Sequence, residues 1–233
     1  MPVFQARDTA ILPLSKMRST IAKRMVQSTN EMPHFFTTTA VDVSELMKLR
    51  KNLKELPGYE GLTFNHMILK ACGMALHSYP RINSSFSPDG IIQHGEINVG
   101  IVTALDDGLL IPVVKDANFK SLSDIVSDAH GLVQRARAGK PKGEDLSGGT
   151  FTISNMGRYD VESFNAIINP GQGSILAVAP IQQEPIVRDG EIKVGNVCRL
   201  TLSVDHRIID GVMCGEFLSD LKKILETPAL ILA

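Results

Sequence analysis

A histidine followed four residues later by an aspartate lies in the heptapeptide DHRIIDG, residues 205–211. An alternating run, residues 199–204, precedes it as in a strand, and an apolar-periodic run, residues 212–225, follows it as in a helix. A histidine at such a turn is held on both sides and can still face a cleft, which suits a general base. His206 is therefore the first candidate for chemistry, although the bare spacing also fits a hydrogen-bonded corner histidine. Asp210 can steer the turn electrostatically or pair with a cation.

The other five histidines have weaker patterns. His66 and His77 fall on an expected helix and are expected to be ordinary helix residues. His94 falls in a turn and His130 on an amphipathic helix, so both are expected to face solvent. His34 precedes an expected strand, where it could line a cleft or anchor the strand.

The composition describes an ordinary globular chain. Its 233 residues are 43% hydrophobic and 21% charged, which fits one large domain. A net charge of −1 and the absence of Trp give no case for nucleic acid or an anionic membrane surface. Cys72, Cys198 and Cys214 are far apart and lack Cys-x-x-Cys spacing, which indicates neither a zinc site nor a disulfide framework. We therefore expect a reducing compartment, the bacterial cytoplasm or alternatively the mitochondrial matrix.

Strands and helices interleave without a regular repeat, which predicts a mixed sheet with helices on one face. Ser44 and Thr63 are the expected N-caps of two of the helices. Helices are expected over residues 15–28, 44–56, 64–79, 121–138 and from Asp210 onward. Strands are expected over residues 35–43, 91–93, 97–105, 110–114, 150–154, 174–179 and 198–204, with a hairpin over 185–194 around Asp189-Gly190.

Several spaced motifs resemble those of one known family. In chain order they are RSTIAKRM at 18–25, PHF at 33–35, GGTFTISNMG at 148–157, INP at 168–170 and DHRIIDG at 205–211. Together they resemble the catalytic core of the dihydrolipoamide acyltransferases of 2-oxoacid dehydrogenase complexes. The resemblance implies an α/β, chloramphenicol-acetyltransferase-like two-layer fold over residues 14–233. Residues 1–13 are then an N-terminal arm or linker remnant, and the chain is expected to be an isolated catalytic domain.

The resemblance also implies a reaction, in which an acyl group passes between the thiols of dihydrolipoamide and coenzyme A. A thiol with a pKa of roughly 8.5 is only a few per cent ionised at neutral pH, so a positioned base is needed. His206 takes that role, and the thiolate attacks the thioester directly. No Gly-x-Ser-x-Gly elbow is present to form an acyl-enzyme. Ser154 aligns with the donor to the oxyanion. Asp210 is expected to be structural, paired with Arg18 or Arg24.

Coenzyme A is expected as a substrate, with the lipoyl group carried on a separate domain. The positions that align with coenzyme-lining residues are Arg50, Thr63, Asn155 and Gly157. Arg50 fits a solvated helix residue equally well. Glycine-rich nucleotide loops are absent from the sequence, and no metal is expected.

Within the family, the stretches around Ser154 and Asn169 look most like the acetyl-transferring branch of pyruvate or acetoin complexes. Branched-chain or other acyl specificity is the alternative. A free-standing coenzyme A-dependent acetyltransferase and a scaffold with vestigial catalytic residues are the rivals from other classes.

The C-terminal sequence ALILA, residues 229–233, predicts a contact with a neighbouring chain, because three aliphatic side chains in water would forfeit roughly 1.5–3 kcal/mol each. Folding back on the same chain is the alternative. The resemblance implies a homotrimer with His206 of one subunit facing Ser154 of the next. It also implies residues 230–232 joining trimers into a larger core. Expected partners are a lipoyl domain, the decarboxylase and dihydrolipoamide dehydrogenase, with no nucleic acid and no membrane.

Overall fold

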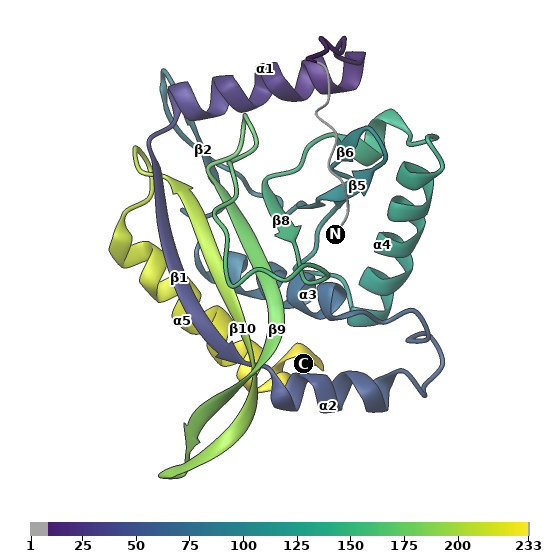
Figure 1. Cartoon of the computed structure of the whole chain (residues 1–233). Helices are drawn as coiled ribbons and strands as arrows, with labels where there is room; N and C mark the ends of the chain where they lie inside the picture. The colour runs from purple at the N-terminus through teal and green to yellow at the C-terminus, as the bar shows by residue number, and fades with distance from the viewer. Residues whose placement is uncertain (1–8, 233) are drawn as a thin grey trace.

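A six-stranded mixed sheet in the order β1-β10-β9-β8-β4-β7 forms the centre of the chain in a computed structural model that describes residues 9–232 (Figure 1). The helices are α1 Lys16–Glu31, α2 Ser44–Leu53, α3 Phe64–Ser78, α4 Leu122–Arg137 and α5 Gly211–Glu226, with short 3₁₀ helices η1 Gly143–Leu146 and η2 Pro228–Leu232. The sheet strands are β1 His34–Asp42, β4 Val99–Ile101, β7 Val113–Val114, β8 Phe151–Asn155, β9 Ser174–Arg188 and β10 Glu191–Asp205. No helix among residues 9–232 is long and apolar enough to cross a membrane.

The sheet is antiparallel on one side and parallel in its middle. Strand β10 pairs antiparallel with both β1 and β9, whereas β8 runs parallel to β9 and to β4. A parallel pair needs a crossover, and the connection from β4 to β8 passes through α4. Two small hairpins lie outside this sheet, β2 Ser84–Ser87 with β3 Gly90–Gln93 and β5 Thr103–Leu105 with β6 Gly108–Leu110. The prediction of a mixed sheet with helices packed on it is confirmed.

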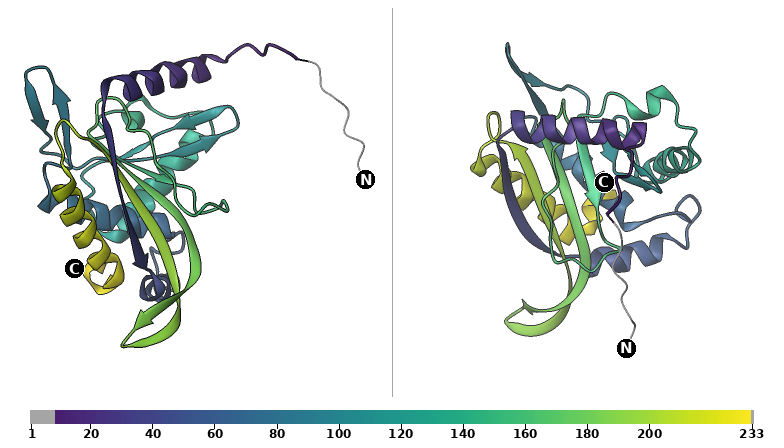
Figure 2. Two further views of the ribbon diagram at one scale, coloured as in Figure 1. Left: turned by 60° about the vertical axis from the view of Figure 1, so that its left-hand side comes forward. Right: turned by 45° about the horizontal axis from the view of Figure 1, so that its top comes forward.

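Helices α3 and α5 pack on one face of the sheet and form the main core. Alternate residues of β10, Leu200, Leu202 and Val204, are buried there against α5. Phe217 of α5 contacts Phe151 of β8 with 6.3 Å between ring centroids. The opposite face carries a smaller cluster beneath residues 164–168, and α1 lies across one end of the sheet (Figures 1 and 2). One face is thus covered by helices, and the other is covered only in part, by the connection before β9.

Strands β9 and β10 form one long hairpin that extends beyond the sheet and curls at its tip (Figures 1 and 2). The expected turn at Asp189-Gly190 is confirmed, since both residues have positive φ, 55° and 79°, as the turn of a two-residue hairpin requires. Each strand has 15 residues and is longer than predicted. The core strands expected at 174–179 and 198–204 continue into the hairpin, with one irregularity in the pairing between Cys198 and Leu200.

Three sequence predictions about local structure are wrong. The strand expected over residues 110–114 is divided between β6, which ends at Leu110, and β7 of the main sheet. Residues 97–105 are not one strand, because β4 belongs to the main sheet and β5 to a separate hairpin. Ser44 does not cap α2, because its hydroxyl donates to the Asp42 carboxylate at 2.6 Å and the N-cap is Val43. The Thr63 cap of α3 is confirmed, and its hydroxyl accepts from the His66 backbone N–H.

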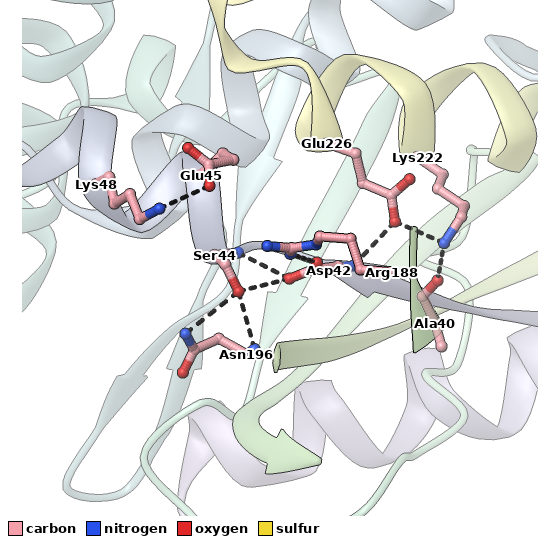
Figure 3. A network of polar contacts seen from close by, with 9 residues as sticks. All are labelled: Ala40, Asp42, Ser44, Glu45, Lys48, Arg188, Asn196, Lys222 and Glu226. Carbon is pink, nitrogen blue, oxygen red and sulfur yellow. Dashed lines mark hydrogen bonds and ion pairs between the residues drawn. The ribbon is translucent and has the colours of Figure 1, made fainter. Parts of the chain in front are cut away.

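The free edge of β1 is covered near its end by side chains of α5, as Figure 3 shows. Lys222 donates to the carbonyl oxygen of Ala40, and a carboxylate oxygen of Glu226 accepts from the N–H of Asp42 at 2.9 Å. Lys222 and Glu226 are themselves an ion pair at 2.7 Å. Arg188, near the hairpin tip, pairs with the Asp42 carboxylate. Two backbone groups of the edge strand therefore have side-chain partners in place of a neighbouring strand.

The two chain ends differ from the predictions in one respect. Of the expected arm, residues 1–13, the first eight lie outside the described residues, and residues 9–13 form no regular element. The tail folds back as η2, which buries Ile231 in the main core of its own chain. Leu230 and Leu232 are 36% and 50% exposed. The prediction that all of residues 230–232 contact another trimer is therefore wrong for Ile231 and stays open for the two leucines; residue 233 is outside the described residues.

Ile231 is buried and its neighbour Leu232 is half exposed, so the two give a matched pair of variants. Ile231→Ala should lower the free energy of unfolding by about 2–4 kcal/mol because it leaves a cavity in the core. Leu232→Ala should cost less than about 1 kcal/mol because the side chain is already half in solvent. Urea unfolding of both variants at one protein concentration checks this. Equal losses would mean that the tail does not pack on its own chain as described.

Candidate active site

The turn that carries His206 is fixed by backbone hydrogen bonds from three directions. The N–H of His206 donates to the carbonyl of Pro33 at 2.9 Å, and the N–H of Asp205 donates to the carbonyl of Gly173 at 2.9 Å. The carbonyl of Asp205 accepts from the N–H groups of Ile208 and Ile209, both at 3.1 Å. The position of His206 is thus set by the ends of β1, β9 and β10 together.

An ion pair between the buried Asp205 and the exposed Arg207, within the same turn, was not predicted from the sequence. The side chain of Asp205 is only 1% exposed. Two guanidinium nitrogens of Arg207, Nε and Nη2, donate to its carboxylate, with Nη2 to Oδ2 at 2.7 Å. The guanidinium of Arg207 also lies 3.9 Å above the ring of Phe86. The charge of Asp205 is therefore satisfied by Arg207, which leaves the intervening His206 side chain outside this pair. The motif DHR contained both residues, but their pairing depends on the turn.

The imidazole of His206 is exposed and packs edge-on against Phe35 of β1. The ring centroids are 4.8 Å apart and the ring planes are at 82°. A Cβ built on Gly211 would lie 3.4 Å from the same phenyl ring, so a small residue suits the start of α5. Phe35 therefore supports the ring without adding charge. The motif PHF includes Phe35, but the sequence did not show whether this side chain contacts His206 or packs in the core.

Asp210 has a structural role in the single chain. It is the N-cap of α5, and its Oδ1 accepts from the backbone N–H of Met213 at 3.0 Å. An acidic N-cap satisfies a free N–H group and complements the helix dipole. The expected ion pair with Arg18 or Arg24 is not formed among residues 9–232, so that prediction is wrong for the single chain. The carboxylate is directed at the first turn of α5 instead.

Ser154 and His206 lie near opposite ends of the strands of the sheet. In the register of β8, β9 and β10, Ser154 is opposite Ala177, and Ala177 is opposite Thr201. His206 is five residues beyond Thr201, about 16 Å along the strand, and two strand spacings add about 10 Å sideways. In a flat sheet the two Cα atoms would then be about 19 Å apart. One chain does not bring its own His206 and Ser154 together.

The four expected coenzyme residues do gather, and they do so at the Ser154 end of β8. Arg50 of α2 donates through Nε to the carbonyl of Leu62 at 3.1 Å, next to the α3 cap Thr63. Asn155 donates through Nδ2 to Oδ1 of Asn65, on the first turn of α3, at 3.3 Å. Its own Oδ1 accepts from the N–H of Gly157 at 2.7 Å. We call Arg50, Thr63, Asn155 and Gly157 the α3 cluster.

His66 belongs to the same region, although the sequence indicated only an ordinary helix residue. Its side chain is almost buried, and its Nδ1 accepts from the backbone N–H of Thr63 at 3.3 Å, completing a capping box. Burial, with further contributions from the charges of His130 and Arg50, lowers the pKa of His66 to about 4. The imidazole is therefore neutral at physiological pH. His94, expected to face solvent, is half-buried and hydrogen-bonded to Ser85.

The chain thus carries two half-sites at opposite ends of the sheet. One has a fixed, exposed imidazole that can accept a proton. The other has the Ser154 hydroxyl next to polar groups and the N-terminus of α3, which can interact with an anionic or polar substrate. A reaction that needs both groups within a few ångströms requires a second copy of the chain.

A family model described as 2-oxoacid dehydrogenases acyltransferase (catalytic domain) matches residues 6–233. The chain is 40% identical over 230 residues to the lipoamide acyltransferase component of the branched-chain alpha-keto acid dehydrogenase complex of Bacillus subtilis, covering 97% of this chain and 54% of that protein. It is 37% identical over 224 residues to the acetyltransferase component of the pyruvate dehydrogenase complex of Zymomonas mobilis, covering 95% and 51%. The chain spans about half the length of the curated relatives it matches.

Solved structures agree with the fold. The Azotobacter vinelandii dihydrolipoamide acetyltransferase matches with a TM-score of 0.92 and 28% identity over 100% of both chains. The cubic core of a pyruvate dehydrogenase multienzyme complex matches with a TM-score of 0.92 and 29% identity, again over 100% of both. A chloramphenicol acetyltransferase matches with a TM-score of 0.56 and 15% identity, over 91% of this chain and 94% of that one. The predicted chloramphenicol-acetyltransferase-like fold is confirmed.

The Azotobacter structure was determined to study a serine, a histidine and an asparagine in the catalytic mechanism. In that protein the serine precedes the histidine by 52 positions, which is also the spacing of Ser154 and His206. The asparagine follows the histidine by four positions, where this chain has Asp210.

The capping contact of Asp210 gives one testable prediction. Asp210→Asn should leave stability within about 0.5 kcal/mol of wild type, because asparagine caps helices as well as aspartate does. Asp210→Ala should cost about 1 kcal/mol because Met213 then loses its acceptor. Thermal or urea unfolding measures both. A loss in Asp210→Asn as large as in Asp210→Ala would show that the charge, and not the cap, matters.

The lowered pKa of His66 gives a second prediction. The unfolded chain protonates this histidine near pH 6.5 and the folded chain only near pH 4, so stability should fall as the pH falls between these values. Between pH 7 and pH 5 the loss from this residue should be about 1–2 kcal/mol. His66→Gln keeps a capping box and cannot titrate, so its unfolding free energy should fall less over the same range. Parallel curves for the two proteins would contradict the burial of His66.

Proposed function

Because the chain belongs to the acyltransferase family of the 2-oxoacid dehydrogenases, we propose that it transfers an acyl group, acetyl by preference, between the thiols of dihydrolipoamide and coenzyme A. The single observation that carries this proposal is the fixed, exposed imidazole of His206, for which Ser154 of the same chain is too distant to share a site. Both groups have the spacing of the catalytic histidine and serine of the Azotobacter acetyltransferase.

In the proposed mechanism His206 accepts the proton of the attacking thiol. The thiolate then forms a bond to the thioester carbonyl carbon, and the carbonyl oxygen becomes an oxyanion. Ser154 of a neighbouring subunit donates a hydrogen bond to that oxyanion, a contact worth about 3–4 kcal/mol of barrier. The intermediate collapses with loss of the other sulfur, which takes back the proton from His206. Exposure of the imidazole, which no charged partner constrains within its turn, supports this role.

Asp210 is proposed to position α5 and the turn before it, and not to carry a proton. Its cap on Met213 supports this assignment. So does the asparagine at the corresponding spacing in the Azotobacter protein, because an amide does not titrate. The α3 cluster is proposed to bind the coenzyme, and its position beside Ser154 would let one subunit hold the thioester and the oxyanion donor together.

A second acyl specificity has an observation in its favour. The Bacillus relative, a branched-chain component, shares 40% identity with this chain, and the Zymomonas acetyltransferase shares 37%. We retain acetyl as the proposal because the sequence around Ser154 resembles that branch. Initial rates with acetyl-coenzyme A and isobutyryl-coenzyme A, each with dihydrolipoamide, decide between them, and chloramphenicol as acceptor tests the free-standing alternative.

The proposed assembly is a homotrimer within a larger core that meets lipoyl domains, a decarboxylase and dihydrolipoamide dehydrogenase. The match to a cubic core supports the assembly, and the exposed Leu230 and Leu232 are available for contacts between trimers. The proposed location is the bacterial cytoplasm, or alternatively the mitochondrial matrix. Cysteines that are buried and unpaired within the described chain suit either reducing compartment.

Complementation between two inactive chains tests the shared site. His206→Ala should lower kcat by at least about 10²-fold as a lost base, and Ser154→Ala by about 10²–10³-fold with little change in KM. When the two variants are unfolded, mixed equally and refolded, random assembly gives about a quarter of sites an intact His206 and an intact Ser154. Activity should then return to about a quarter of the wild-type value.

Each variant refolded alone is the control and should remain inactive. Mixing without unfolding should also restore nothing, since intact assemblies do not exchange subunits at once. No recovery after joint refolding, with particles of normal size, would contradict a site shared between subunits. A His206→Ala protein with more than about a tenth of wild-type kcat would contradict the proposed base.

A further inference from the structure

His34 has both ring nitrogens engaged by backbone groups. Its Nδ1 lies 2.8 Å from the carbonyl oxygen of Met32, and its Nε2 lies 3.1 Å from the backbone N of Ile168. A carbonyl can only accept, so Nδ1 carries the proton. An amide N–H can only donate, so Nε2 carries the lone pair. The contacts therefore define one neutral tautomer, and they favour anchoring over the lining of a cleft.

Both backbone polar groups of Ile168 are hydrogen-bonded to side chains. Its N–H donates to His34, and its carbonyl oxygen accepts from the hydroxyl of Ser28 at 2.6 Å. Ile168 and Ser28 are both fully buried. The end of α1 and the start of β1, which adjoin in sequence, are therefore both bonded to the distant connection before β9 through the backbone of Ile168.

This junction adjoins the His206 turn on two sides. Pro33, whose carbonyl accepts the N–H of His206, lies between the two residues that the Nδ1 contact joins, Met32 and His34. The segment that continues from Ile168 reaches Gly173, whose carbonyl accepts the N–H of Asp205. His34 is itself opposite Asp205 in the β1–β10 register. The ring thus ties together both segments that hold the backbone of the turn.

We propose that His34 is a positioning residue for the transferase reaction, which sets the place of the His206 imidazole through the carbonyls of Pro33 and Gly173. The inference rests on the proposed function, in which His206 is the base. His34 is not itself a proton acceptor in the reaction, because the lone pair on its Nε2 accepts the N–H of Ile168. A displacement of about 1 Å in a reacting group costs on the order of 10²-fold in rate, so the anchor should matter for turnover without contacting substrate.

Asparagine and glutamine divide the two contacts of the ring between them. The Asn amide nitrogen reaches about the position of Nδ1, so His34→Asn can keep the donor to Met32 and loses the acceptor for Ile168. The Gln amide oxygen reaches about the position of Nε2, so His34→Gln can keep the acceptor and loses the donor. His34→Ala loses both. His77→Ala, at an exposed histidine near the end of α3, is the matched control.

The experiment measures kcat and both KM values with acetyl-coenzyme A and dihydrolipoamide on the assembled protein, alongside particle size. We expect His34→Ala to lower kcat by about 10–100-fold with KM values within about threefold of wild type. We expect at least one of the amide variants to recover about tenfold of that loss, and the recovering variant identifies the contact that positions the turn. His77→Ala should match wild type.

Two outcomes would overturn the inference. One is a His34→Ala protein with kcat within about twofold of His77→Ala. The other is a loss in all three His34 variants, without recovery by either amide and with broken assembly, which would show a purely structural role. His206→Ala is assayed in the same series. If it stays active, the proposed function fails; if it is inactive while His34→Ala is normal, only the positioning role fails.

Discussion

The hydrogen bond from the His206 N–H to the Pro33 carbonyl is the contact on which the position of the proposed base depends. It extends the β1–β10 ladder by one step beyond the last strand residue, so the histidine is held by sheet geometry and not by a free loop. The Asp205–Arg207 fork and the cap of Asp210 on α5 fix the turn on its other sides. An exposed ring on rigid backbone is the combination that proton transfer needs, because the group must meet solvent-borne substrate without moving.

The same sheet that fixes His206 also keeps it away from Ser154. The register places Ser154 of β8 two strands away from Thr201 of β10, and His206 follows Thr201 by five residues. No side-chain motion closes a gap of about 19 Å. The proposed chemistry therefore requires subunits to associate for activity. One subunit would contribute the end of the sheet with His206, and its neighbour the end with Ser154.

Much of the fold could be predicted from local sequence, and the exceptions have physical reasons. Thr63 and Asp189-Gly190 act through nearby backbone, and the cap and the turn are where the pattern indicated. The division of residues 97–105 could not be seen, because alternation is the same whichever sheet a strand joins. His206 was found from its motif, whereas Phe35 and Arg207 contribute through contacts that exist only once β1, β2 and the turn meet. Asp210 was expected to pair with a distant arginine, but the local N–H groups of α5 were nearer partners.

The Lys222–Glu226 pair on the open edge of β1 has a consequence for how copies of the chain can join. A bare edge strand offers its N–H and C=O groups to any other strand, and addition there has no natural end point, so it leads to fibres. Here the carbonyl of Ala40 and the N–H of Asp42 are already used by a cation and an anion from the chain's own helix. An incoming strand would have to displace both charges before gaining its first bond at that end of β1. Open-ended polymerisation by strand addition is thereby disfavoured at that end of β1.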